Sequence, residues 1–163
     1  MTTPLPEPSM RVFRQAVAAH FQPFSRELGV AWRVVCPWVE GFSTPTVQVT
    51  VGVYHGHSPS LCVKFRPTSP PAPLGTDDEN VFGLVWVQTF VSGQTPPRTH
   101  EKRLSAEIIA GEVETLAAQF AEFAMPLLTA PNTDWAAIRS FVRERVAASI
   151  PEHIKRFANG RDA

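Results

Sequence analysis

The sequence predicts an α+β fold: a four-stranded antiparallel β-meander with an N-terminal helix and two to three C-terminal helices packed on the sheet. Three observations lead to this prediction. Apolar residues recur at helical spacing near both ends of the chain, whereas apolar and polar residues alternate in its middle. The connections between the alternating segments are also too short for the crossovers that parallel strands require.

Composition supports one domain with β-structure and firm turns. The chain has 163 residues, of which 44% are apolar, and this is enough for a single buried core. Its sixteen prolines exceed the usual share, and its charged fraction of 18% is low. We expect a flexible tail at residues 1–8, a single domain at 9–158 and a second tail at 159–163.

An apolar stripe near the N-terminus predicts the first helix. Ser9 is placed to act as its N-cap, and Gly29 is placed to end it. Pro23 lies inside the pattern, so we expect a kink or a restart near Gln22. The stripe consists of Met10, Phe13, Val17, Phe21, Phe24 and Leu28.

Three strands are then expected at residues 30–36, 46–53 and 61–66, with a turn at 40–45 between the first two. The clearest pattern is the second strand, in which four valines alternate with polar residues or glycine. The connection 54–60 between the second and third strands indicates a hairpin. Residues 67–80 contain four prolines and no apolar periodicity, which predicts an exposed loop.

The segment "VFGLVWVQTFV", residues 81–91, is predicted to be the fourth strand. It is apolar on both alternating faces. Such a strand is either covered on both sides by its own chain or uses one face to meet a partner. We therefore predict that partner binding uses one face of this strand, formed by Phe82, Leu84, Trp86 and Phe90. The alternative interface is the apolar stripe of the long helix predicted from about Ser105 to Leu128.

Helices are predicted for most of the remaining chain. A continuous apolar stripe indicates a long helix from about Ser105 to Leu128. Asn132 or Thr133 is placed to cap another helix, and Pro151 is placed to begin a last turn that ends at Gly160. The inward residues of the capped helix are predicted to be Trp135, Ile138, Val142 and Val146.

The histidine pair in "YHGHSPS" is the first candidate for chemistry. His55 and His57 would point to one side of an extended strand, but no further ligand stands at a diagnostic spacing. Cys62 and a nearby histidine would form a nucleophilic dyad only in an electropositive setting. A plain hairpin with an inert cysteine is the favoured interpretation, and a His/Cys metal protein remains an alternative.

No other motif indicates catalysis. The acidic cluster at residues 76–80 lacks the spacing of a calcium loop, which favours a solvated turn. The sequence contains no phosphate-binding glycine loop and no common hydrolase motif. We therefore predict a protein that is not an enzyme, with no catalytic residues, no metal and no cofactor.

Charge and cysteine content bear on location and partners. The formal net charge is zero at pH 7, so any contact with nucleic acid would have to be local. The basic C-terminal segment, with Arg143, Lys155 and Arg156, supplies such a local charge and makes an accessory nucleic-acid role an alternative. Two cysteines, no export signal and no apolar run of membrane length favour the cytoplasm and no membrane partner.

The strand-like "VFGLVWVQTFV" followed by "LSAEIIAGEVETLAAQFAEFAMPLL" resembles small bacterial domains of the type III secretion chaperone-like and YbjN-like kind, and the likeness runs from about Met10 to Leu128. The chain is also similar to small α+β immunity-type domains of bacteria. Both resemblances imply protein binding. The first implies a non-enzymatic, homodimeric adaptor or chaperone-like module that holds another protein.

Overall fold

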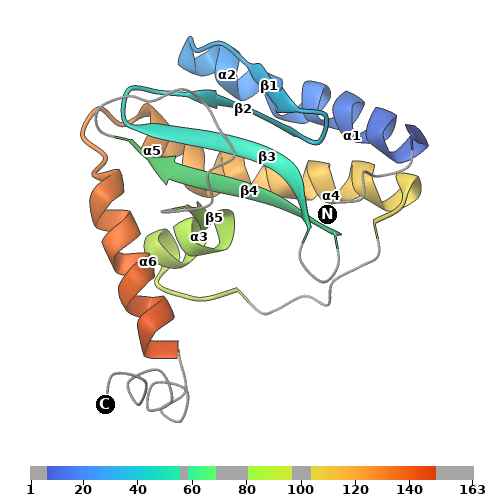
Figure 1. The fold of residues 1–163 in the computed structure, drawn as a ribbon. Helices are drawn as coiled ribbons and strands as arrows, with labels where there is room; N and C mark the ends of the chain where they lie inside the picture. Colours follow the sequence, from blue (N-terminus) through green and yellow to red (C-terminus); the bar gives the residue numbers. More distant parts are fainter. Residues whose placement is uncertain (1–6, 56–58, 69–80, 97–103, 150–163) are drawn as a thin grey trace, which may run out of the picture.

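The computed structural model describes residues 7–55, 59–68, 81–96 and 104–149, and it has an α+β fold with one antiparallel sheet (Figure 1). The strands follow the order β1-β2-β3-β4-β5, so every strand pairs with its neighbour in sequence. They are β1 (Arg33–Cys36), β2 (Val39–Ser43), β3 (Val47–His55), β4 (Pro59–Pro67) and β5 (Phe82–Gly83). The helices are α1 (Glu7–His20), α2 (Gln22–Leu28), α3 (Leu84–Ser92), α4 (Ala106–Gln119), the π-helical turn η1 (Phe120–Ala124), α5 (Met125–Thr129) and α6 (Trp135–Ser149).

One face of the sheet forms the core. The alternating valines of β3 all lie on it and are fully buried, together with Phe42 of β2 and Phe65 of β4. Figure 1 shows α4 running behind β3 and β4 with α1 beside it, and α1 packs against α4. The ring of Phe120, in η1, occupies the centre of this layer and contacts four other phenylalanine rings.

The opposite face of the sheet is polar, and its side chains contact one another. The Arg66 guanidinium donates to Gln48 Oε1 at 2.6 Å, and the Thr50 and Tyr54 hydroxyls lie 2.8 Å apart. The Lys64 ammonium lies 3.6 Å from the centre of the Tyr54 ring, in a cation–π contact. Polar and apolar residues alternate in β3 because the polar side chains face this polar surface and the valines face the core.

The break in the N-terminal helix is confirmed. Helix α1 ends at His20 and α2 begins at Gln22, since Pro23 has no N–H and fits only the first turn of a new helix. Gly29 ends α2 with a left-handed φ of 70°. The predicted cap at Ser9 is wrong: α1 already includes Glu7, and Ser9 is buried inside the helix.

The sheet has five strands because residues predicted as a turn form β2. Gly41 interrupts the apolar pattern of this segment, yet it lies directly opposite Thr50 in the ladder. A Cβ at Gly41 would collide with the carbonyl oxygen of Val49, so only glycine allows the two backbones to approach this closely. The turn follows β2, where the Thr44 hydroxyl accepts the N–H of Val47.

The prediction of a fourth strand over residues 81–91 is wrong for most of its length. Only Phe82–Gly83 pairs with β4, and the next nine residues form α3. The buried residues of this helix include Leu84, Val87 and Gln88. Their spacing of three residues and then one residue fits one face of a helix and does not fit the alternation of a strand. An apolar run satisfies the helical and the extended periodicity alike, so tertiary packing decides between them.

The predicted C-terminal helices are confirmed, but a π-helical turn interrupts the long helix between α4 and α5. Pro126 cannot donate to an α-helical bond, and the chain widens into the π-turn before it, where the Met125 N–H bonds to the Phe120 carbonyl.

Helix α6 differs from its prediction in two respects. It is capped by Asp134 instead of Asn132 or Thr133, through a 3.0 Å bond from the Ala137 N–H. The second correction concerns the stripe of α6: Trp135, Ile138 and Val142 are buried, but Val146 is exposed.

Several predictions fall outside the described residues. These are most of the two tails, the loop after Thr68, and the last turn from Pro151 to Gly160.

Candidate functional site

The four predicted partner-binding residues do not share one face. Phe82 and Leu84 are buried in the core of their own chain, and the Phe82 ring stacks on Phe65 with centroids 5.8 Å apart. Trp86 is half-buried against that core, whereas Phe90 is exposed. The change from strand to helix explains this, because residues two apart lie on opposite sides of a helix.

Helix α3 exposes three large apolar side chains along its nine residues. Val85, Phe90 and Val91 are each between 40% and 48% exposed, and α3 contains no charged residue. They are three of the five large apolar side chains exposed within the described part of the chain. Val85 and Val91 lie at odd-numbered positions of the predicted strand, on the face opposite to Phe82, Leu84, Trp86 and Phe90, so the predicted partner-binding face did not include them.

Helix α6 packs against α3 and presents a fourth exposed apolar residue, Val146. The Phe90 and Phe141 rings meet edge to face with centroids 5.4 Å apart. The exposed residues of α3 and α6 therefore belong to neighbouring helices at one end of the molecule (Figure 1).

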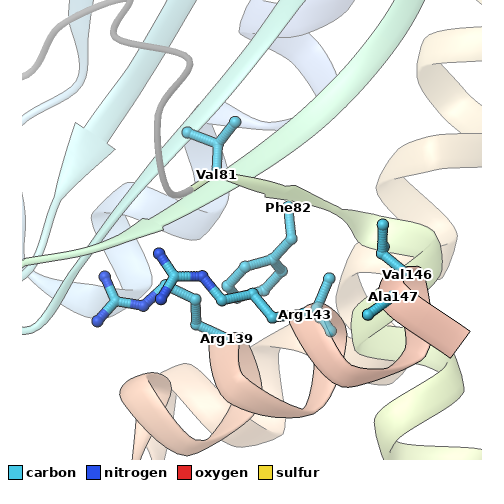
Figure 2. A pocket seen from close by; sticks show the side chains of 7 residues that line it. Val81, Phe82, Arg139, Arg143, Val146 and Ala147 are labelled. Carbon is cyan, nitrogen blue, oxygen red and sulfur yellow. The ribbon is translucent and has the colours of Figure 1, made fainter. Parts of the chain in front are cut away.

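A groove of about 340 Å³ lies between the start of β5 and α6 (Figure 2). Phe82 and Val142 are its buried apolar residues, and Val146 lies at its exposed end. Arg139 and Arg143, one helical turn apart, extend their guanidinium groups toward the same side in Figure 2. The groove is lined by Val81, Phe82, Arg139, Val142, Arg143, Val146 and Ala147.

The charged side chains in the described part of the groove lining are both arginines. Helix α6 as a whole carries Arg139, Arg143 and Arg145 against the single acid Glu144. The segment from α4 to α5, by contrast, has four glutamates and no lysine or arginine. The net charge of the whole chain is zero, although α6 is basic and α4 is acidic.

One buried carboxylate was not anticipated, because Glu40 was assigned to a turn. It lies on the core face of β2, opposite Val51, and is 5% exposed. Glu40 Oε1 accepts a bond from the Trp32 indole N–H at 3.1 Å, and Oε2 has no hydrogen-bond partner. The single bond to Trp32 places this carboxylate in the core and does not by itself make a site.

The histidine and cysteine candidates remain predictions. His57 lies outside the described residues, as does the acidic cluster at 76–80, and His55 is placed only by its backbone at the end of β3. Cys62 is a free thiol whose sulfur lies 3.6 Å from the Ser60 hydroxyl. Where the structure describes the chain, no three side chains of metal-binding type lie together.

The nucleic-acid candidates are only partly placed. Arg143 lines the groove, whereas Lys155 and Arg156 lie outside the described residues.

Within the described ranges, no helix is both long enough and apolar enough to cross a membrane. Comparisons of the chain with protein-family models, curated proteins and solved structures found no match.

Proposed function

We propose that this protein is a non-enzymatic protein-binding adaptor or chaperone-like module of a bacterial cytoplasm, and that it forms a homodimer through α3 and the adjoining surface of α6. The observation that carries the proposal is the exposure of Val85, Phe90 and Val91 on a helix without charged residues. Exposed apolar surface of this kind is typical of protein interfaces. The non-enzymatic part rests on the absence of catalytic motifs from the sequence.

The area that a stable interface must bury determines how much of the protein surface takes part in the proposed dimer. A stable interface buries roughly 800 Å² on each partner, which is more than one nine-residue helix supplies. Helix α6 packs beside α3 and adds Val146 and the edge of Phe141. The dimer contact is therefore proposed to span both helices, with α3 at its centre.

Sedimentation over a wide range of protein concentrations tests self-association. We expect a monomer–dimer equilibrium in which Val91→Ser raises the dissociation constant about tenfold. Each of the two copies of Val91 would bury only the half of its surface that is exposed in the monomer, which contributes roughly 0.7 kcal/mol per copy and roughly 1.5 kcal/mol per dimer. Val85→Ser should act in the same direction. Phe90 is less suitable for this test because its ring also packs within the chain, on Phe141.

The matched control is Val34→Ser. Val34 is the most exposed large apolar residue of the described chain, at 66%, but it lies on the edge strand β1. This variant should dimerise like the wild type. A chain that stays monomeric throughout the concentration range, or a Val34→Ser variant weakened as much as Val91→Ser, would show that α3 is not the interface.

A further inference from the structure

We infer that the outer edge of β1 binds an extended segment of a partner protein as an added strand, with apolar side chains beside Trp32 and Val34 and an acidic side chain opposite Arg33. This inference rests on the proposed protein-binding role and adds the chemical class of the partner. It shares no residue with the proposed dimer surface on α3 and α6.

The backbone of β1 supplies hydrogen-bonding groups along this edge. Strand β1 is the first in the order β1-β2-β3-β4-β5, and among the described residues β2 is the strand that pairs with it (Figure 1). An edge strand directs every second N–H and C=O away from its neighbour, and an extended peptide can pair with these groups. The outer edge of β1 therefore offers the main-chain half of a strand-addition site.

Val34 supplies an open apolar contact at the same edge. It is 66% exposed, more than any other large apolar side chain in the described part of the chain. Val34 pairs with Glu40, which lies on the core side of β2, so Val34 faces the core side of the sheet where the covering helices leave it open. A neighbouring strand with an apolar residue beside Val34 would cover this surface.

Trp32, immediately before β1, supplies an aromatic ring whose orientation is fixed. Its indole N–H donates to Glu40 Oε1 at 3.1 Å, and its ring lies 6.1 Å from that of Phe42 between centroids. Trp32 is half-buried, so part of the ring remains accessible. Tryptophan is enriched among the residues that contribute most to protein interfaces, and a ring that is already oriented loses little entropy on binding.

Arg33 determines the charge of the segment. Arg33 is exposed, and its ladder neighbour on β2 is Gly41, which has no side chain. A Cβ at Gly41 would collide with the carbonyl oxygen of Val49, so the fold keeps this position without a side chain. The cross-strand neighbour of Arg33 on the outer side would be a residue of the added strand. An opposite charge is favourable at a directly paired position and a like charge is unfavourable, so an acidic residue is expected there.

The geometry favours another protein over a second copy of this chain. Self-pairing at β1, together with a dimer through α3, would give each chain two self-complementary interfaces and would join the chains into an open polymer. Strand β1 has four residues, and its register shifts between Val34 and Cys36. A short strand with such an irregularity resists long edge-to-edge pairing but leaves room for a short extended segment.

The test uses two short capped peptides with valine at every second position, one with glutamate and the other with lysine between the valines. Binding is followed by NMR, through the shifts and the hydrogen exchange of the β1 amides, with the α3 amides as the reference. We expect the glutamate peptide to slow exchange at β1 and to bind about fivefold more tightly than the lysine peptide.

N-methylation of the peptide tests strand addition itself. Successive residues of an added strand direct their N–H groups alternately toward β1 and away from it. Methylating two adjacent residues, one in each peptide variant, should therefore weaken binding about tenfold in one variant and leave it unchanged in the other. Binding through side chains alone would not produce this alternation.

Variants of β1 test the two side-chain contacts. Arg33→Glu should reverse the preference between the peptides, whereas Arg11→Glu, the same charge change at an exposed position of α1, should keep it. Val34→Ser should weaken the glutamate peptide about fivefold because it removes apolar surface at the contact. Unchanged exchange of the β3 amides in each variant shows that the sheet is intact.

Three outcomes would overturn the inference. Equal binding of the two peptides removes the acidic residue opposite Arg33. The absence of peptide binding, or an equal effect of both N-methyl positions, removes strand addition. Slower exchange of the β1 amides at rising protein concentration without peptide would make the occupant a second copy of this chain.

The dimer and the edge fail separately. Val91→Ser should weaken the dimer and leave peptide binding unchanged, whereas Val34→Ser should do the opposite. A dimer that persists without peptide binding therefore refutes this inference alone. A monomer that binds the glutamate peptide refutes only the proposed self-association.

Discussion

Replacing Phe120 with alanine should destabilise this fold more than removing any exposed aromatic ring. Phe120 is fully buried, and four rings lie within 6.5 Å of its own, measured between centroids: Phe24 at 4.9 Å, Phe21 at 5.6 Å, Phe65 at 6.0 Å and Phe42 at 6.5 Å. These neighbours come from the N-terminal helical segment and from two strands. One side chain thus joins the helical layer to the sheet.

The cost follows from the cavity and from the lost ring contacts. A buried Phe→Ala change removes about 3–5 kcal/mol of unfolding free energy. Aromatic pairs add about 0.5–1.5 kcal/mol each beyond area burial, and surrounding groups relax only partly. We expect Phe120→Ala to lower the unfolding free energy by about 4 kcal/mol. Phe90→Ala should lower it by about 1 kcal/mol, because the Phe90 ring is 40% exposed and packs on the ring of Phe141.

Urea unfolding followed by circular dichroism measures both variants at several protein concentrations, so that any dimer contribution is separated from the chain's own stability. If Phe120→Ala fails to fold, Phe120→Leu keeps most of the volume and should cost about 1.5 kcal/mol. An unfolding free energy lowered no more by Phe120→Ala than by Phe90→Ala would refute the packing described around η1.

The same assay checks three further predictions. Gly111→Ala should stabilise the chain by about 0.5–1 kcal/mol, because Gly111 lies inside α4 and an added Cβ would meet no atom within 4 Å. Gly29→Ala should destabilise it by about 1 kcal/mol, because φ at this position is +70°; stabilisation by both alanines would contradict the backbone argument. Asp134→Ala should cost about 1 kcal/mol through the lost cap on the Ala137 N–H, and Asn132→Ala should leave stability unchanged if Asp134 is the cap.

Local patterns predicted those elements whose two faces differ in chemistry. In β3 the valines face a core and their neighbours face a polar surface, so alternation in the sequence reports the fold directly. The break between α1 and α2 was also predictable, since Pro23 acts through its own missing N–H. Both signals depend only on residues close in sequence.

The failures have a different physical origin. In residues 81–91 nearly every position is apolar, so the run fits a strand or a helix and the surrounding core decides. In β2 the pairing of Gly41 with Thr50 depends on a close backbone approach from another strand. Neither contact is encoded by periodicity within the segment itself.

The groove could be predicted in part only. The spacing of Arg139 and Arg143 on one side of a helix is visible in the sequence, and Arg143 was selected as a candidate for binding nucleic acid. The apolar floor was not visible, because Phe82 reaches α6 through a fold that joins segments about sixty residues apart in the chain.

The exposed end of the groove follows from a mismatch in length between two elements. Helix α6 has fifteen residues and is about 22 Å long, whereas β5 has two residues and covers about 7 Å. Along the inward stripe of α6, exposure is 4% at Trp135, 1% at Ile138 and 7% at Val142, and then 42% at Val146. The apolar stripe therefore continues past the surface that covers its first half. Arg139 and Arg143 lie on either side of Val142 in the sequence, so the uncovered end of the apolar stripe and two basic side chains lie together on α6.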